Sequence, residues 1–402
     1  METDFYRIER LPPYVFAEVN RMKAEARARG EDIIDFGMGN PDSPTPPHIV
    51  EKLIECVHNP DTHRYSVSRG INGIRKAQAA YYERRFNVSL DPETEVIMTM
   101  GSKEGLANLA TAISKPSDFV LVPTPNYPIH AYGFIIAGAS VRYLPHTDTN
   151  SLMQQIRNAV EGSAPKPLAL ILNFPCNPTS ATTTLDFYAE VVDFCKFHGV
   201  YIISDLAYCE IYFGAPPPSI LEIPGAKDIA IEFTTLSKTY SMPGWRVGFG
   251  VGSPVLIKAL TRIKSYLDYG AFTPIQVAAT AALNGPQTCV EEARALYRER
   301  RDILVHGLHD AGWNVTTPDA SMFVWAEIPP QFQPMDSLTF SKALLENAGV
   351  AVAPGVGFGT HGDTHVRFAL VENIQRTRQA CRNIKRFFNN ASAVSKSKEK
   401  SA

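Results

Sequence analysis

The sequence lacks three features that would narrow its function at once: an excess of positive charge, a membrane-length apolar run and closely spaced cysteines. Its 402 residues include 39 basic and 41 acidic side chains, for a formal net charge of −2. That balance gives no electrostatic surface for nucleic acid or an anionic membrane. The longest apolar runs, such as 168–174, have the length of a strand and are far shorter than a membrane span. We therefore expect no nucleic-acid partner and no membrane partner.

The cysteines and histidines point away from disulfide and metal chemistry. The six cysteines are scattered and include no C-x-x-C pair. The N-terminus "METDFYRIERLPPYVF" has no basic start followed by an apolar core. Together these features predict unpaired thiols and a cytoplasmic location. His361 and His365 are four residues apart in a glycine-rich loop, which predicts loop histidines rather than a metal site.

From about residue 90 the chain alternates strand-like and helix-like segments. Short apolar runs, each typical of a buried strand, occupy 95–100, 119–123, 168–174, 200–204 and 228–236. Helical patterns lie between them, such as 185–199, which closes on a glycine. This alternation predicts an α/β fold with a mostly parallel central sheet covered by helices on both faces. In such folds ligands bind beyond the carboxyl ends of the strands.

The chain is long enough for more than one domain, since domains average about 150 residues. We assign the alternating region, 46–290, to a large domain. After residue 290 the pattern changes, and 291–388 predict a smaller α+β domain. Residues 1–45 are expected to pack on the small domain. Residues 389–402 are small, polar and basic, which predicts a disordered tail.

Several polar residues follow the predicted strands. Lys238 ends the run 228–236, and a lysine there must be solvated, paired or used in chemistry. Asp205, Tyr208 and Asn177 follow two other strands. A carboxylate in that position needs a cationic partner or several hydrogen-bond donors.

The segment "MGSKEG" (100–105) places small and hydroxyl residues where a helix begins, which suits a phosphate. Ser102, Lys103, Ser237 and Arg246 would complete such a phosphate site. A lysine, a carboxylate, a phenol, an amide and a phosphate site are together what pyridoxal 5′-phosphate (PLP) requires. Each residue alone has a structural explanation, but their order at successive strand ends favours the cofactor site.

At these residues the sequence resembles a known family. The motifs "TLSKTYSMPGWRVG", "DLAY", "NPT" and "VRFAL" resemble those of class I/II, fold-type I PLP-dependent aminotransferases, over about residues 10–388. In "RLPPYVF", "HRYSVSRGI" and "GSKEGLA" it is most similar to the bacterial glutamate–pyruvate (alanine) aminotransferases. One position departs from the family pattern: "NPTG" is "NPTS" here, with Ser180 in place of glycine, which leaves the turn geometry open.

The resemblance implies a role for each site residue. Lys238 would form the Schiff base with PLP and act as the acid and base for proton transfer. Asp205 would pair with the ring nitrogen, and Tyr127 would stack on the ring. The ring hydroxyl would be held by Tyr208 and Asn177. The phosphate would be held by Ser102, Lys103, Ser237, Arg246 and, from the neighbouring subunit of a homodimer, Tyr65.

The resemblance also implies small-molecule substrates, which are amino acids and 2-oxo acids. Arg367 would bind the substrate α-carboxylate, helped by Asn177 and the Gly39 backbone. The expected reaction is ping-pong transamination, with L-alanine and 2-oxoglutarate giving pyruvate and L-glutamate. LL-diaminopimelate or methionine as amino donor remains an alternative. So do a PLP-dependent C–S lyase, which could use the same residues, and a PLP-sensing regulator, although fewer than about 45 residues precede the core for a DNA-binding segment.

Overall fold

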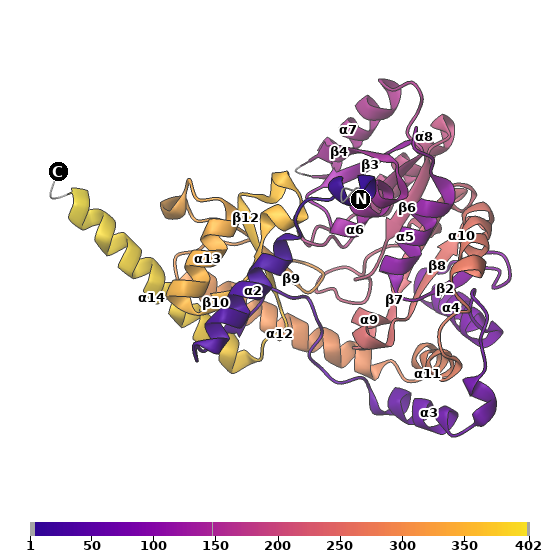
Figure 1. Cartoon of the computed structure of the whole chain (residues 1–402), viewed down its shortest axis with the longest axis horizontal. Coiled ribbons are helices and arrows are strands. Elements are labelled where there is room, and N and C mark those ends of the chain that lie inside the picture. The colour runs from indigo at the N-terminus through magenta and orange to yellow at the C-terminus, as the bar shows by residue number, and fades with distance from the viewer. Residues whose placement is uncertain (1–4, 147, 400–402) are drawn as a thin grey trace.

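The computed structural model describes residues 5–146 and 148–399. Figure 1 shows two lobes: a large one built on a central sheet, and a small one that contains β9, β12, α13 and α14. Helix α12 (Thr288–Asp310) runs between them. Within residues 5–146 and 148–399, no helix has both the length and the apolar character needed to span a bilayer.

The large domain contains a seven-stranded sheet in the order β2-β8-β7-β6-β5-β3-β4. The strands are β2 (Val96–Thr99), β3 (Phe119–Thr124), β4 (Ser140–Pro145), β5 (Ala169–Asn173), β6 (Tyr201–Asp205), β7 (Ala230–Thr235) and β8 (Gly248–Gly252). β8 is antiparallel to both its neighbours, and the pairs among β4, β3, β5, β6 and β7 are parallel. The predicted α/β fold with a mostly parallel sheet is confirmed.

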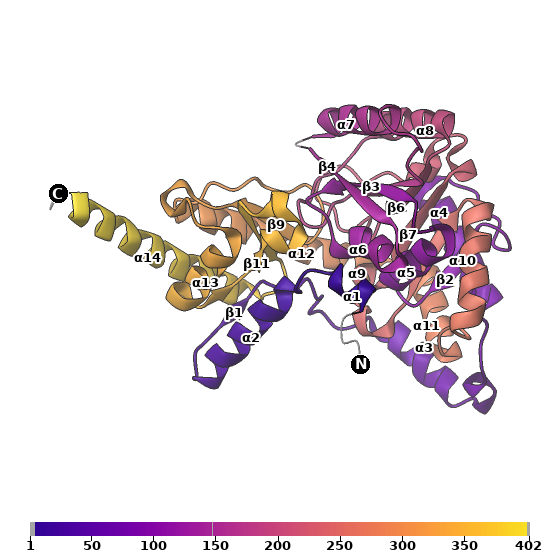
Figure 2. The same ribbon diagram turned by 45° about the horizontal axis from the view of Figure 1, so that its top comes forward.

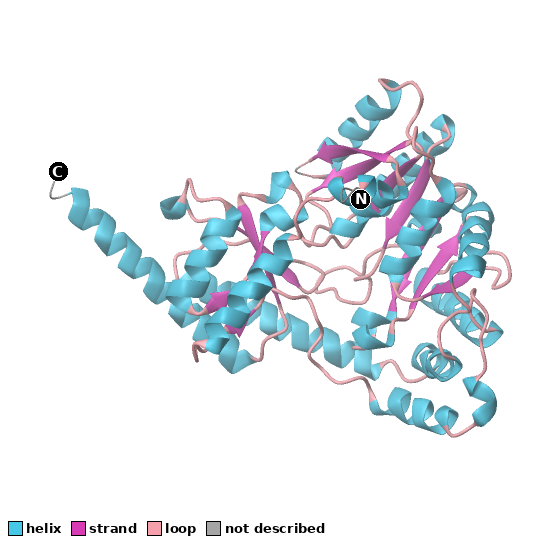
Figure 3. Cartoon of the chain, viewed as in Figure 1, coloured by secondary structure: helices cyan, strands magenta, loops and turns pink. Residues whose placement is uncertain are grey.

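Helices cover both faces of this sheet, as Figure 3 makes visible. One face packs against α4 (Asn72–Phe86), α7 (Thr149–Glu161), α8 (Leu185–His198) and α11 (Thr273–Asn284). The other packs against α5 (Ser102–Ile113), α6 (Pro128–Ala137) and α10 (Pro254–Leu267). α3 (Pro47–Val57) lies on α11. Because both faces are buried, the central strands are apolar along most of their length, which is why they are recognisable in the sequence.

The small domain has its own core and a three-stranded antiparallel sheet. Its strands are β9 (Phe323–Glu327), β11 (Ala353–Pro354) and β12 (His365–Ala369). The helices beside them are α12, α13 (Ser337–Ala348) and α14 (Ile374–Glu399). The predicted smaller α+β unit is therefore present.

The N-terminal segment contacts both lobes. β1 (Ile34–Asp35) pairs in parallel with β10 (Val350–Ala351) of the small domain, and α2 (Val15–Ala28) packs against β11 of the same domain. The short helix α1 (Tyr6–Glu9) lies instead against α6 of the large domain (Figure 2). Just after α1, Arg10 donates to the carbonyl oxygens of Ile135 and Ala139 at the end of α6, at 3.3 and 2.7 Å. The segment thus joins the two lobes rather than resting on the small one alone.

The last helix is longer than the sequence pattern predicts. α14 continues through Glu399, past the boundary expected at 388, and residues 400–402 of the predicted tail lie outside the described residues. The stretch 374–399 contains no glycine or proline, so no residue type that normally ends a helix interrupts it.

Candidate active site

The predicted site residues converge at one edge of the large sheet. β2, β3, β5, β6 and β7 all end there, and β8, which runs in the opposite direction, begins there. A cavity of about 580 Å³ lies at this edge, between the two domains. The predicted residues that line it are Gly39, Ser102, Lys103, Tyr127, Asn177, Asp205, Tyr208, Ser237, Lys238, Arg246 and Arg367.

Lys238 lies in the one-turn helix α9 (Leu236–Thr239) directly after β7. Its Nζ donates to the carbonyl oxygen of Gly39 at 2.6 Å. Burial, together with the nearby positive charges of Arg367 and Arg246, lowers the pKa of Lys238 to about 8. The amine therefore loses its proton at lower pH than an ordinary lysine, and more of it is neutral near physiological pH, as a nucleophilic lysine requires.

Asp205 has a partner that the sequence does not predict. His130 Nε2 lies 2.8 Å from Asp205 Oδ2, and both side chains are buried. The other carboxylate oxygen accepts from the backbone N–H of Ala207 at 3.2 Å. His130 lies in α6, one turn after Tyr127, and its only signal in the sequence is a polar residue in an otherwise apolar helix. The pair fixes the carboxylate in the floor of the cavity.

Arg367 is held on three sides in β12. Its Nη1 donates to Asn177 Oδ1 at 2.6 Å and its Nη2 to the Gly37 carbonyl at 3.1 Å. Its guanidinium carbon lies 4.1 and 4.6 Å from the ring centroids of Phe323 and Phe358. Among the described residues, its buried Nε has no hydrogen-bond partner. Burial lowers the pKa of Arg367 to about 10. A buried cation with an unused donor suits an incoming carboxylate.

Asn177 also faces the phenol of Tyr208, with its Nδ2 donating to the hydroxyl at 3.5 Å. Burial raises the pKa of Tyr208 far above its ordinary value, so the phenol stays protonated and can donate a hydrogen bond.

The amino end of α5 forms a compact polar corner. Gly101, with φ of 83°, precedes the helix, and a side chain there would overlap the Arg246 guanidinium. A side chain at Gly248 would meet the backbone nitrogen of Ser102 at 2.5 Å. These close approaches bring Arg246 and the free N–H groups of α5 together, which suits a phosphate. Lys103 is exposed, with its Nζ 5.9 Å from the Tyr127 ring centroid.

Tyr65 does not reach this cavity. Its side chain is 86% exposed, and its ring lies 4.8 Å from that of Tyr269. The position is compatible with a contribution to another subunit and not to this chain's own site.

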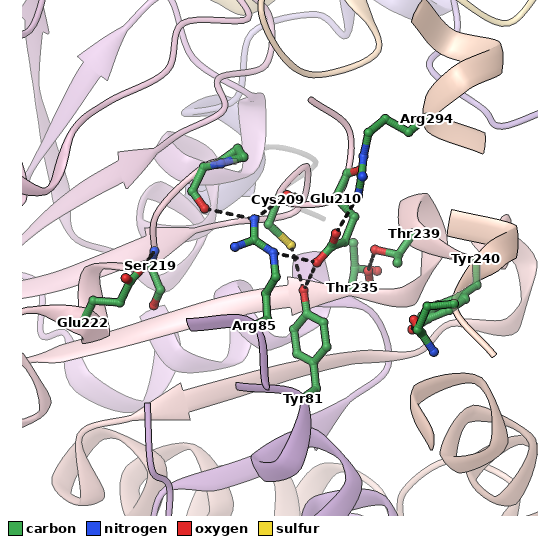
Figure 4. A network of polar contacts seen from close by, with 12 residues as sticks. Tyr81, Arg85, Cys209, Glu210, Ser219, Glu222, Thr235, Thr239, Tyr240 and Arg294 are labelled. Carbon is green, nitrogen blue, oxygen red and sulfur yellow. Dashed lines mark hydrogen bonds and ion pairs between the residues drawn. The ribbon is translucent and has the colours of Figure 1, made fainter. Parts of the chain in front are cut away.

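Below the site, an ionic network anchors the segment that follows Tyr208 (Figure 4). Glu210 accepts from Tyr81 at 2.6 Å, from Arg85 at 3.2 Å and from Arg294 at 3.1 Å. The three partners come from α4 and α12, so the network ties the site to both helices.

Comparison with known proteins identifies the family of this chain. The pattern described as "Aminotransferase class I and II" matches residues 31–384. The chain belongs to the class I and II aminotransferases. A chain named AatC from Rhizobium meliloti (strain 1021) is 60% identical over 389 residues, 96% of each chain. The glutamate-pyruvate aminotransferase AlaC of Escherichia coli (strain K12) is 55% identical over 388 residues, 96% of this chain and 94% of that one.

Less similar proteins also match over nearly the full length. An LL-diaminopimelate aminotransferase from Moorella thermoacetica is 42% identical over 381 residues, 94% of this chain and 97% of that one. The substrate-bound structure of BacF from Bacillus subtilis superposes with a TM-score of 0.88 at 35% identity, covering 96% of this chain and 98% of that one.

Class I and II aminotransferases use PLP, and the residues of this cavity fit that group. The cavity offers a lysine amine, a buried carboxylate and the polar corner at α5, which correspond to the reactive carbonyl, the ring nitrogen and the phosphate. Arg367 lines the same cavity and adds a buried positive charge to it.

Proposed function

We propose that this aminotransferase exchanges amino groups between L-alanine and 2-oxoglutarate, giving pyruvate and L-glutamate. The observation that carries the choice of substrates is the 55% identity, over nearly the whole of both chains, with a glutamate-pyruvate aminotransferase. The cavity is compatible with it, because its walls include the apolar side chains of Phe16, Met38 and Phe358, which suit a methyl group.

In this proposal Arg367 binds the substrate α-carboxylate with a bidentate fork, and Asn177 and the Gly39 backbone help to orient it. Lys238 Nζ would then take the proton from the α-carbon of the amino donor and, in the half-reaction with the 2-oxo acid, would give a proton to the α-carbon of the new amino acid. Bound PLP supplies a conjugated electron sink for the charge that remains when this proton leaves.

The other residues hold the cofactor in place. Asp205, oriented by His130, keeps a proton on the ring nitrogen. Tyr208 and Asn177 bind the ring hydroxyl, and Tyr127 packs on the ring. The phosphate binds at the amino end of α5, where the proposed ligands are Ser102, Lys103, Ser237 and Arg246.

A half-reaction assay tests the substrates. The PLP-loaded protein is mixed with one L-amino acid at a time while the cofactor absorbance is followed. We expect L-alanine and L-glutamate to convert the cofactor rapidly, and pyruvate and 2-oxoglutarate to reverse the conversion. Slow conversion by both amino acids would contradict the proposal.

A second candidate is LL-diaminopimelate aminotransfer, which the 42% identity with such an enzyme favours. Adding LL-diaminopimelate and methionine to the same panel separates the alternatives, since the preferred donor converts the cofactor fastest at equal concentration. Pyruvate and ammonia released from cystathionine without an amino acceptor would instead indicate lyase chemistry.

We also propose a homodimer in which Tyr65 reaches the phosphate site of the neighbouring subunit. Tyr65 and Tyr269 are both exposed, with their rings 4.8 Å apart, and the segments that contain them expose other large apolar side chains: Ile54, Val57, Val67, Tyr266, Leu267 and Phe272. Exposed apolar side chains that gather in a patch mark protein–protein contacts. Sedimentation of the active protein tests the assembly: a dimer is expected, and an active monomer would contradict it.

A further inference from the structure

Two serines with left-handed backbones meet where the large domain contacts the start of β9. Ser180 has φ of 62° and Ser321 has φ of 66°, and both are buried. Their Oγ atoms lie 2.6 Å apart. This backbone region is unfavourable for residues other than glycine, so it persists only where surrounding contacts enforce it. Ser180 is the position where the family pattern "NPTG" has glycine.

The two hydroxyls close a ring of hydrogen bonds around Phe323. Ser180 Oγ donates to the Phe323 carbonyl at 2.9 Å, and Ser321 Oγ accepts from the Phe323 N–H at 3.2 Å. Since the Ser180 proton is used by that carbonyl, Ser321 donates to Ser180. Each hydroxyl thus donates once and accepts once. Glycine or alanine at either position would open the ring.

The ring connects two of the groups that hold Arg367. Ser180 closes a turn by donating its N–H to the Cys176 carbonyl at 2.9 Å. Asn177 lies in this turn and accepts a hydrogen bond from Arg367 Nη1. The Phe323 ring lies 4.1 Å from the guanidinium carbon on another side. The turn belongs to the large domain and Phe323 to β9 of the small domain, and the serine pair links them directly.

We propose that Ser180 and Ser321 are positioning residues that hold Asn177 and Phe323 at fixed positions around Arg367. They thereby set the affinity of the site for the amino acid α-carboxylate. The inference rests on the proposed role of Arg367. In this chain the hydroxyl at 180 supplies a fixed connection between the domains that glycine cannot supply.

The clearest test is Ser180→Gly, because glycine adopts φ of 62° freely and only the hydroxyl contacts are lost. The probe is 2-methylalanine, which has the α-carboxylate and amine but no α-proton to remove. Its dissociation constant is measured from the change in cofactor absorbance on binding to the PLP-loaded protein. We expect S180G to weaken binding about fivefold, the effect of one ordinary hydrogen bond. Affinity for PLP itself should stay within about twofold of wild type.

Three further variants make the outcome specific. S321G should weaken 2-methylalanine binding as S180G does, and the double variant should add little, since both changes open the same ring. Ser341→Ala, which removes another buried hydroxyl from within α13, should leave binding unchanged. Unchanged probe binding in S180G, or an equal loss of PLP affinity, would overturn the inference.

Arg367→Lys separates this inference from the proposed function. If R367K weakens probe binding strongly and S180G does not, only the positioning role fails. If R367K leaves probe binding unchanged, the carboxylate role of Arg367 fails and the inference falls with it.

Discussion

His130 Nε2 lies 2.8 Å from Asp205 Oδ2, and neither side chain has appreciable access to solvent. The histidine comes from the first turn of α6 and the carboxylate from the end of β6. A buried carboxylate held by a second buried residue keeps one orientation, which is what a partner for a ring nitrogen requires.

Asp205→Ala should retain PLP but lose most turnover. The phosphate ligands remain in place, whereas the carboxylate that stabilises the protonated ring is gone. We expect kcat for alanine to fall by at least about 100-fold. His130→Gln should lower kcat in the same direction by about tenfold, as expected for a hydrogen bond to a charged group. Steady-state kinetics on variants whose PLP content is known from absorbance would check this, and near-normal kcat in D205A would contradict the assigned role.

Loading of the apoprotein with PLP should accelerate as pH rises, with a midpoint near pH 8. The reason is that the lowered pKa of Lys238 makes the reactive neutral amine predominant above that value. Arg367→Gln removes one of the positive charges that lower this pKa, so its midpoint should move to higher pH. Arg157→Gln, at an exposed ion pair on α7, serves as the control and should match wild type. A midpoint above 10 in the wild type would show that the lysine is not perturbed.

Stability should decrease as pH rises from about 4.5 towards 7, because of Glu232. This carboxyl is fully buried in β7 and accepts hydrogen bonds from Tyr82, Ser204 and Ser219. Burial raises its pKa to about 7, from 4.5. The folded state therefore binds the proton more tightly than the unfolded state, and this advantage is complete below 4.5 and lost through 7.

Glu232→Gln isolates that contribution. The difference in unfolding free energy between wild type and E232Q should change by about 2–3 kcal/mol across this pH range, measured by urea unfolding at several pH values. A difference that stays constant with pH would mean that Glu232 does not titrate there.

Glu210→Ala should destabilise the protein by about 3 kcal/mol, because Arg85 and Arg294 would lose their common carboxylate partner at a largely buried position. Urea unfolding measures this directly. Glu190→Ala removes an exposed ion pair with Arg157 and should cost less than about 1 kcal/mol. Equal effects of the two substitutions would mean that the network contributes no more than a surface pair.

The strands and the residues at their ends could be predicted because both signals are local. The apolar run 168–174 contains the strand Ala169–Asn173, Asp205 is the last residue of β6, and Lys238 lies three residues beyond the end of β7. The missed strand β4 lies at the edge of the sheet and is largely exposed, so its apolar signal is weak.

The missed contacts depend on how distant elements dock. His130 is 75 residues from Asp205, and Ser180 is 141 residues from Ser321. No periodicity in one sequence specifies such pairs. Arg246 could be predicted only in part, because its motif is recognisable but its position in the fold is not. It reaches the site because β8 runs antiparallel to its neighbours, which brings the amino end of β8 to the edge where the other strands end.

The placement of the chain ends matters for attaching the enzyme to a surface. The N-terminal segment passes along α6 and contributes Tyr14 and Phe16 to the cavity wall. The end of α14 instead projects away from both lobes (Figures 1 and 3). A bulky fusion or a covalent tether before α1 would pull on the segment that forms part of the cavity wall. One attached after α14 would lie away from both lobes and leave the cavity open to solution.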